Sequence, residues 1–326
     1  MRSSAIHTST FYLGDCISGA AEHIPDNSVD LIITDPPYGI HGDKLHLHYN
    51  RDESFVVEGY VEVPQEEYAA FSVNWIKEAE RVLRPGGSMY IISGYTNLAD
   101  ILNALRQTQL KEINHIIWKY SFGVFTRRKY VSSHYHILFY EKPGGRRTFN
   151  LESRYGLNEK SGDNKSCNNT DREDLWIINR ENKPGRIKNK NELPCALLTK
   201  MIQYSSNEGD LVADFFLGGF STAKVAIGLN RRAIGFEISE RMYATKIKEM
   251  ESITPGYLFP TLRTPAIKAT KNRGKPWTGE DCTRLMRRYA ALRAKGRNKK
   301  ETIAALGEEF GRGRWAIEKA LKKLLP

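Results

Sequence analysis

The tetrapeptide Asp-Pro-Pro-Tyr combines residue types that could hold and modify a planar amine. The carboxylate of Asp35 only accepts hydrogen bonds, and because Pro36 and Pro37 lack N–H groups, the carbonyls around them are left to accept as well. An exocyclic amino group of a nucleobase donates two hydrogens in one plane, and the ring of Tyr38 offers a stacking surface for a base flipped out of a duplex. The competing interpretation is a proline-rich turn followed by a packed tyrosine.

A second set of residues could bind a nucleoside. Gly218 and Gly219 follow the apolar segment 210–216, and glycines let a turn pass close to a ligand. Glu237 stands 23 positions after Asp214, and an acidic residue at about that distance can accept hydrogen bonds from both hydroxyls of a ribose. On its own the pattern is weak, because Gly-Gly turns between strands and helices are common and Glu237 could be a solvated strand end.

The elements that must position these residues alternate between strands and helices. An apolar run from Ser28 delivers Asp35 to the end of a predicted strand, where ligands bind in open α/β sheets. Helical spacing of apolar residues follows at 65–83, 194–206 and 221–230. Further strands are predicted at 88–93, 113–119, 134–140, 210–216 and 231–238. This alternation predicts a doubly wound α/β fold with a mostly parallel sheet.

The chain resembles the β class of amino-methylating DNA methyltransferases over roughly residues 10–250. In that class the D-P-P-Y element precedes the glycine turn, as TDPPYGI (34–40) here precedes DFFLGGFSTAKVAIGLNRRAIGFEI (214–238). Further similar segments are GDC (14–16), ERVLRPGGSMYI (80–91), NHIIWK (114–119), YHILFYEK (135–142) and DLW (174–176). The resemblance implies a Rossmann-like fold of the class I S-adenosylmethionine-dependent methyltransferases, with circularly permuted motif order.

The same resemblance implies how the cofactor S-adenosylmethionine would be held. Asp15 and Cys16 would lie near its adenine ring, Asp214 and Gly218 near its amino-acid part, and Glu237 on its ribose. Ser221 and Thr222 would lie beside the methionine carboxylate, at a helix N-terminus whose free N–H groups favour an anion. The complete expected cofactor-binding set is Asp15, Cys16, Asp35, Asp214, Phe216, Gly218, Gly219, Ser221, Thr222 and Glu237.

The implied reaction is methylation of the exocyclic amine of a flipped base, with catalytic residues Asp35, Pro36, Pro37 and Tyr38. The aspartate favours N6 of adenine, because N4-cytosine enzymes of the family more often carry serine there. Positioning and electrostatic complementarity would provide the rate, without a covalent enzyme intermediate or a metal. The alternatives are N4-cytosine or RNA methylation, or a sequence-specific DNA-binding protein whose methylase domain has degenerated. A companion restriction enzyme would make the chain part of a restriction-modification system.

The glycine turn departs from the family pattern D-P-F-x-G-S-G-T-T. Phe215 replaces the proline, Gly219 the serine and Phe220 the last glycine, and Leu193 replaces the lysine of the usual Lys-Pro. A bulky Phe220 where the backbone approaches the ligand weighs against cofactor binding, which would favour the degenerate alternative. Gly219 can supply the flexibility that is lost at Phe220, so we expect binding.

Positive charge concentrates in the last part of the chain. Residues 270–326 hold 16 Lys+Arg against 6 Asp+Glu, whereas the first 269 residues are nearly balanced, at 33 against 32. Such asymmetry points to a polyanionic partner, because each cation placed on a phosphate releases counterions. The alternative, a solubilising tail, is disfavoured by helical periodicity in 277–323.

Three helical stretches are expected in the C-terminal module, 277–326. Thr278 and Asn298 are candidate N-caps, and Gly296 and Gly311 are candidate stops. The apolar positions, among them Trp315, would share a small core. The module resembles a Myb/SANT-like or helix-turn-helix domain, which implies major-groove contact by its third helix; a dimerisation module is the alternative. The expected DNA contacts are Arg127, Arg128 and Lys129 near the site, and Arg312, Arg314, Lys319 and Lys322 in the module.

The remaining segments indicate the domain bounds, the location and the partners of the protein. We predict a methyltransferase domain at 1–251, a polar loop or insertion at 142–190 with a role in target choice, and a linker at 252–276. His41, His46 and His48 beside Asp43 are read as a polar loop rather than a metal site. No signal peptide, membrane span or paired cysteine spacing is evident, so a cytoplasmic, DNA-associated protein is expected. The partners expected are double-stranded DNA and, as often in the family, a second copy of the chain in a homodimer.

Overall fold

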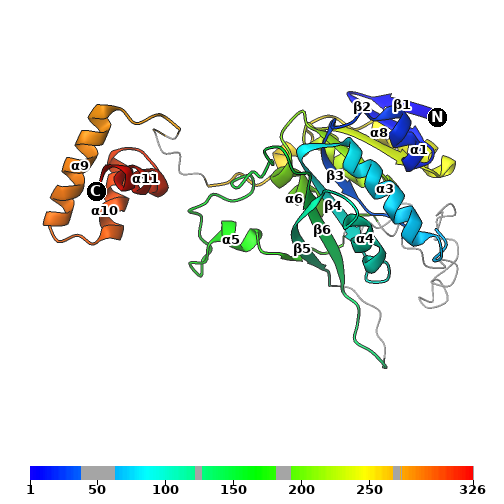
Figure 1. Cartoon of the computed structure of the whole chain (residues 1–326), viewed down its shortest axis with the longest axis horizontal. Helices are drawn as coiled ribbons and strands as arrows, with labels where there is room; N and C mark the ends of the chain where they lie inside the picture. The colour runs from blue at the N-terminus through cyan, green and yellow to red at the C-terminus, as the bar shows by residue number, and fades with distance from the viewer. Residues whose placement is uncertain (38–62, 122–126, 181–191, 267–271, 273, 326) are drawn as a thin grey trace. The chain divides into compact units, whose positions relative to one another are not determined.

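In the residues that the structure describes, a sheet of nine strands forms the centre of the larger unit of the chain, Met1–Pro265. The computed structural model describes residues 1–37, 63–121, 127–180, 192–266, 272 and 274–325. The strands are β1 (Arg2–Ile6), β2 (Ser9–Leu13), β3 (Val29–Thr34), β4 (Leu83–Ser93), β5 (Lys111–Lys119), β6 (His134–Glu141), β7 (Leu175–Ile177), β8 (Leu211–Asp214) and β9 (Arg232–Glu237). Their order in the sheet is β1-β2-β9-β8-β3-β4-β6-β5-β7. Figure 1 labels β1 to β6.

The sheet is mixed but mostly parallel, which confirms the predicted fold class. The pairs β2·β9, β9·β8, β8·β3, β3·β4 and β5·β7 are parallel. The antiparallel pairs are β1·β2, β4·β6 and β6·β5. Strand β3, which leads to the D-P-P-Y element, and strand β8, which leads to the glycine turn, are neighbours.

Helices cover both faces of this sheet, which explains why its central strands read as continuous apolar runs. Leu31 and Ile33 of β3 belong to a core with α6 (Cys195–Ser205), α7 (Ser221–Gly228) and α8 (Glu240–Glu251). Ile32 belongs to the opposite core, with α1 (Cys16–His23), α3 (Tyr68–Val82) and α4 (Leu98–Leu105). All three of these β3 side chains are fully buried.

The described part of the predicted loop, residues 142–180, is more ordered than its polar composition predicts. It contains α5 (Cys167–Asp171) and β7, which extends the sheet by pairing with β5. Asp171 accepts hydrogen bonds from the Arg154 guanidinium at 2.9 Å and the Tyr204 hydroxyl at 2.7 Å. The segment is therefore held to α6 by a buried polar network, which hydrophobic periodicity cannot reveal. Strands β1 and β2 at the N-terminus were not predicted either.

The smaller unit, Ala266–Pro326, contains the three predicted helices, α9 (Gly279–Ala294), α10 (Lys299–Glu309) and α11 (Arg314–Leu324). Thr278 and Asn298 form capping boxes with Asp281 and Glu301, as their residue types indicate. Gly296 and Gly311 have positive φ, at 80° and 56°. The shared core consists of Leu285, Leu292, Ile303, Leu306, Phe310, Ile317, Ala320 and Leu321.

Trp315 was predicted to belong to that core, and this prediction is wrong. Its side chain is 80% exposed, because it lies at the start of α11 on the face opposite to Ile317 and Leu321. None of the described helices is long and apolar enough to cross a membrane.

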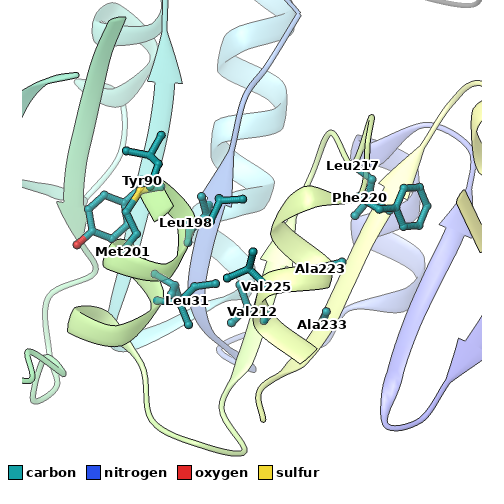
Figure 2. Packing of buried hydrophobic residues seen from close by; sticks show 14 of the residues in the cluster. Leu31, Tyr90, Leu198, Met201, Val212, Leu217, Phe220, Ala223, Val225 and Ala233 are labelled. Atoms are coloured by element: carbon teal, nitrogen blue, oxygen red, sulfur yellow. The ribbon is translucent and has the colours of Figure 1, made fainter. Parts of the chain in front are cut away.

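Phe220 occupies a conformation that favours glycine, yet its ring is part of the core. Its φ is 59°, and its side chain is completely buried. The ring packs edge-on against Phe11, with centroids 5.3 Å apart, and against Tyr243 at 6.3 Å. Figure 2 shows the ring directed away from α7 and toward the N-terminal strands. Packing on β2 and α8 thus compensates for the strained backbone, and the bulk of Phe220 fills the core.

Phe220→Ala should therefore act on stability. Removing a fully buried ring with little room to collapse should lower the free energy of unfolding by about 4 kcal/mol. Guanidinium denaturation followed by circular dichroism measures the loss. Phe259→Ala, at a side chain that is 38% exposed, is the matched control, for which less than about 1 kcal/mol is expected. Similar losses in the two variants would contradict the core assignment of Phe220.

Candidate functional site

The D-P-P-Y element and the glycine turn leave the sheet side by side. In the register of β3 and β8, Leu31 lies beside Val212 and Ile32 beside Ala213. Both strands are parallel, so Asp35 and Asp214 emerge at the same edge. The hydroxyl of Thr34 donates a hydrogen bond of 3.0 Å to Oδ1 of Asp214, 180 positions away in the chain. The two motifs form one site.

The N-terminal residues expected to bind the cofactor join the same edge. Leu13 at the end of β2 is in register with Glu237 at the end of β9, and Gly14 N donates to the Glu237 carbonyl at 2.9 Å. Oδ1 of Asp15 caps α1 by accepting from the Ser18 amide at 2.8 Å. Burial, with Asp15 nearby, raises the pKa of the Cys16 thiol well above its ordinary value, so Cys16 contributes a neutral packing surface.

Glu237 fixes the shape of the glycine turn. Its Oε2 accepts from the Gly218 amide and its Oε1 from the Ser239 amide, both at 2.8 Å. The side chain is buried, and this burial raises the pKa of the carboxyl group. Each carboxylate oxygen can accept more than one hydrogen bond, so Glu237 keeps acceptor capacity for two hydroxyl groups.

Asp214 is a buried acid at the centre of the site. Burial raises its pKa to about 6, although hydrogen bonds from Thr222, the Phe216 amide and Thr34 oppose that shift. The hydroxyl of Thr222 is therefore engaged with Asp214 in the interior, and Thr222 is only 2% exposed. Any contact of Thr222 with the methionine carboxylate would therefore come from its backbone N–H in the first turn of α7, and this contact stays a prediction. Ser221, which is partly exposed, lies at the first position of α7.

The D-P-P-Y element is anchored by a residue that the sequence reading missed. The hydroxyl of Tyr68 on α3 donates to the Pro37 carbonyl at 2.7 Å, so this carbonyl is not left free as expected. Asp35 is half-buried and Pro36 buried. A buried tyrosine at the start of a helix reads as core in sequence, and no local pattern links it to Pro37. Tyr38, Asp43 and the histidines at 41, 46 and 48 lie outside the described residues.

The basic segment Arg127, Arg128 and Lys129 connects β5 to β6. Because Lys119 at the end of β5 pairs with His134, the segment leaves the sheet at the same edge as the site. All three cations are exposed, and neighbouring Tyr130 is 98% exposed. In the part of the chain that the structure describes, no group of three or more metal-binding side chains is found.

Arg312 is placed in the interior of the C-terminal unit, unlike the expectation that it contacts DNA. It is 6% exposed and donates to the carbonyls of Lys275 at 2.6 Å and Pro276 at 2.9 Å. Its guanidinium also lies 4.2 Å from the centre of the Trp277 ring. Arg312 therefore ties the segment before α9 to the turn before α11. The other predicted cations of this unit, Arg314, Lys319 and Lys322, are exposed.

Comparisons with known proteins agree on one family. A family model for N6- and N4-methyltransferases, described as DNA methylase, matches residues 29–249. The Type II methyltransferase M.HpaI of Haemophilus parainfluenzae is 32% identical over 246 residues, 73% of each chain. The DNA adenine methyltransferase YhdJ of Escherichia coli K12 is 30% identical over 258 residues, 74% of this chain and 82% of YhdJ.

The fold has solved counterparts. A DNA modification methylase from Thermus thermophilus, TTHA0409, solved in complex with S-adenosyl-L-methionine, superposes with a TM-score of 0.54. The match has 23% sequence identity and covers 80% of this chain and 98% of TTHA0409. At this identity the likeness supports the fold.

The pKa of Asp214 predicts a pH-dependent contribution to stability. Because the folded-state pKa, about 6, exceeds the ordinary 3.8, protonation of Asp214 stabilises the folded state relative to the unfolded state. This gain is fully present below pH 3.8 and is lost as the pH rises through about 6. The free energy of unfolding of the native protein, relative to that of Asp214→Asn, should fall by about 2 kcal/mol between pH 4.5 and pH 7.5. Denaturation of both proteins at each pH measures this difference. A difference independent of pH would contradict this assignment.

Proposed function

The chain belongs to the DNA methylase family, and we propose that it transfers a methyl group from S-adenosylmethionine to the N6 amine of an adenine flipped out of double-stranded DNA. The observation that carries the proposal is the pairing of β3 with β8, which unites Asp35 with the glycine turn at one edge. Aspartate in the D-P-P-Y element and the adenine specificity in the name of YhdJ favour adenine over cytosine.

The residues at this edge fit the cofactor, which supplies an electrophilic methyl group when bound. Glu237 has the acceptor capacity to bind the ribose, and Asp15 with Cys16 lies beside it on the neighbouring strand end. Gly218, Gly219, Phe216 and Ser221 would surround the amino-acid part. The ring of Phe220 packs in the core, which removes the steric argument for a degenerate cofactor site.

The exocyclic amine of adenine is a poor nucleophile because its lone pair is delocalised into the ring. Asp35 and the carbonyl of Pro36 would accept its two hydrogens and hold the nitrogen in line for attack, while Tyr38 would stack on the base. The Thr34 to Asp214 hydrogen bond ties the strand carrying Asp35 to the strand carrying the cofactor turn. The Tyr68 hydroxyl holds Pro37 through the hydrogen bond to its carbonyl. These two hydrogen bonds support the proposal that the fold sets the distance between the target amine and the cofactor.

Asp35→Ala should abolish methyl transfer. Losing the acceptor that orients the amine should lower the rate by at least about 100-fold, while cofactor binding changes little. Transfer from labelled S-adenosylmethionine to genomic DNA, followed by digestion to nucleosides, measures rate and product together. N6-methyladenine from the native protein is expected. N4-methylcytosine would overturn the choice of base, and full activity in the variant would overturn the role of Asp35.

We further propose that α11 contacts the DNA. Trp315, Lys319 and Lys322 recur at intervals of four and three residues, so they share one exposed face of the helix. An exposed tryptophan between cations fits a nucleic acid, because the cations bind phosphates and the ring packs on sugars or bases. Arg314 adjoins this face, paired with Glu318 at 2.8 Å. Arg127, Arg128 and Lys129 would contact DNA beside the active site.

Replacing Lys319 and Lys322 together by alanine should weaken DNA binding in a salt-dependent way. Two lost phosphate contacts should reduce the slope of log affinity against log salt by about 2. The matched control replaces Lys295 and Lys300, two exposed cations at the end of α9 and the start of α10, and should change the slope less. Trp315→Ala should lower affinity at every salt concentration with the slope unchanged. Equal slope changes in both double variants would contradict the α11 interface.

The homodimer and the DNA-associated cytoplasmic location stay predictions from the family resemblance. Sedimentation velocity of the protein with and without a DNA duplex tests the first of them.

A further inference from the structure

Glu192 lies directly against the glycine turn. A Cβ atom built on Gly219 would come 2.5 Å from Cγ of Glu192 and 2.6 Å from its Oε1, closer than real Cβ contacts. The backbone φ is positive at Gly218 (48°) and at Phe220 (59°), but not at Gly219. Glycine at 219 therefore leaves space for Glu192 to approach the turn, and the expectation that it supplies flexibility for Phe220 stays a prediction.

The carboxylate of Glu192 is held in place by Lys246. The Lys246 ammonium lies 3.4 Å from Oε1 of Glu192, and its side chain is only 8% exposed. The same ammonium is closer to Glu249, with Oε1 at 3.1 Å and Oε2 at 3.2 Å. Lys246 thus orients Glu192 over the turn while its shorter contacts go to Glu249.

The acids that flank the turn differ in what they can still bind. Asp214 is buried and engaged by Thr34, Thr222 and the Phe216 amide, and both oxygens of Glu237 are bonded to backbone amides. The Glu192 side chain is 27% exposed, and within the described residues its polar contact is the ion pair with Lys246. Glu237 keeps acceptor capacity for the ribose hydroxyls, whereas Glu192 is the more exposed carboxylate that contacts the turn itself.

We propose that Glu192 binds the α-ammonium group of the amino-acid part of S-adenosylmethionine. The inference rests on the proposed function, because it assumes this cofactor. A zwitterionic amino acid needs an anion for its ammonium next to donors for its carboxylate. Phe220, the N-cap of α7, makes no side-chain cap, so its side chain does not occupy the first N–H groups of the helix, which would bind the carboxylate. Glu192, in contact with Gly219, would supply the negative charge for the ammonium, one residue before the N-cap Phe220.

The charges around the turn support this arrangement. Lys246 and Lys224 both pair with Glu249, Lys224 at 2.7 Å. A cofactor ammonium arriving at Glu192 would therefore complete an alternating array of three cations and two carboxylates without displacing Lys246 from Glu249. Neutralisation by Lys246 also limits repulsion between Glu192 and the cofactor carboxylate.

Two ligands that differ in the amino-acid part test the proposal by calorimetry. S-adenosylhomocysteine carries the α-ammonium, whereas 5′-deoxy-5′-methylthioadenosine lacks the whole amino-acid group. Glu192→Gln should weaken S-adenosylhomocysteine binding about tenfold, because a charge-assisted hydrogen bond is lost, and should change methylthioadenosine binding less than twofold. Glu249→Gln is the matched control, since it removes the other partner of Lys246 without touching the turn, and it should affect both ligands less than twofold.

Each other result has a definite meaning. Unchanged S-adenosylhomocysteine affinity in Glu192→Gln would overturn the ammonium assignment. Equal losses for both ligands would also overturn it, and would assign Glu192 to the shape of the turn. A native protein that binds neither ligand would refute the proposed function itself, and with it the inference.

Discussion

The parallel pairing of β3 with β8 is the constraint on which the rest of the site depends. Strand β3 ends in Asp35 and strand β8 in the glycine turn, and the hydrogen bond from Thr34 to Asp214 ties their ends together. Parallel neighbours place their carboxyl ends at one edge, so a base-binding element and a nucleoside-binding element become one site. The pairing of β2 with β9 then brings Asp15 to the same edge.

The glycine turn shows how one short segment satisfies three demands. Gly218 gives its amide to Glu237, Gly219 leaves room for Glu192, and Phe220 directs its ring into the core. A phenylalanine at positive φ costs roughly 1 kcal/mol of backbone strain, which burial of the ring outweighs. The bulk that would obstruct a ligand in an extended chain is turned inward by the left-handed backbone. The departure from the family pattern thus alters how the turn is packed, with the bulky ring placed in the core.

Cations with similar sequence surroundings have different roles in the folded chain. Arg312 and Arg314 stand two residues apart, yet Arg312 is buried on backbone carbonyls while Arg314 faces solvent on α11. Lys200 is another buried cation, next to Asp171 and 4.3 Å from the Trp176 ring, and burial lowers its pKa to about 8. Net charge therefore indicates a polyanionic partner for the C-terminal unit. Only the exposure of each side chain distinguishes the cations that can contact this partner from those that stabilise the fold.

The sequence by itself determined the alternating α/β fold, the class of chemistry, the acids Asp35, Asp214 and Glu237, and the three capped C-terminal helices. These follow from local causes, namely hydrophobic periodicity, proline and glycine geometry, and capping residues. Only the tertiary structure decided the roles of Tyr68, Glu192 and Thr222, the inward ring of Phe220, the burial of Arg312, the exposure of Trp315 and the order in 142–180. Each of these depends on partners far away in the chain, and a contact between distant segments leaves no periodic trace in either one.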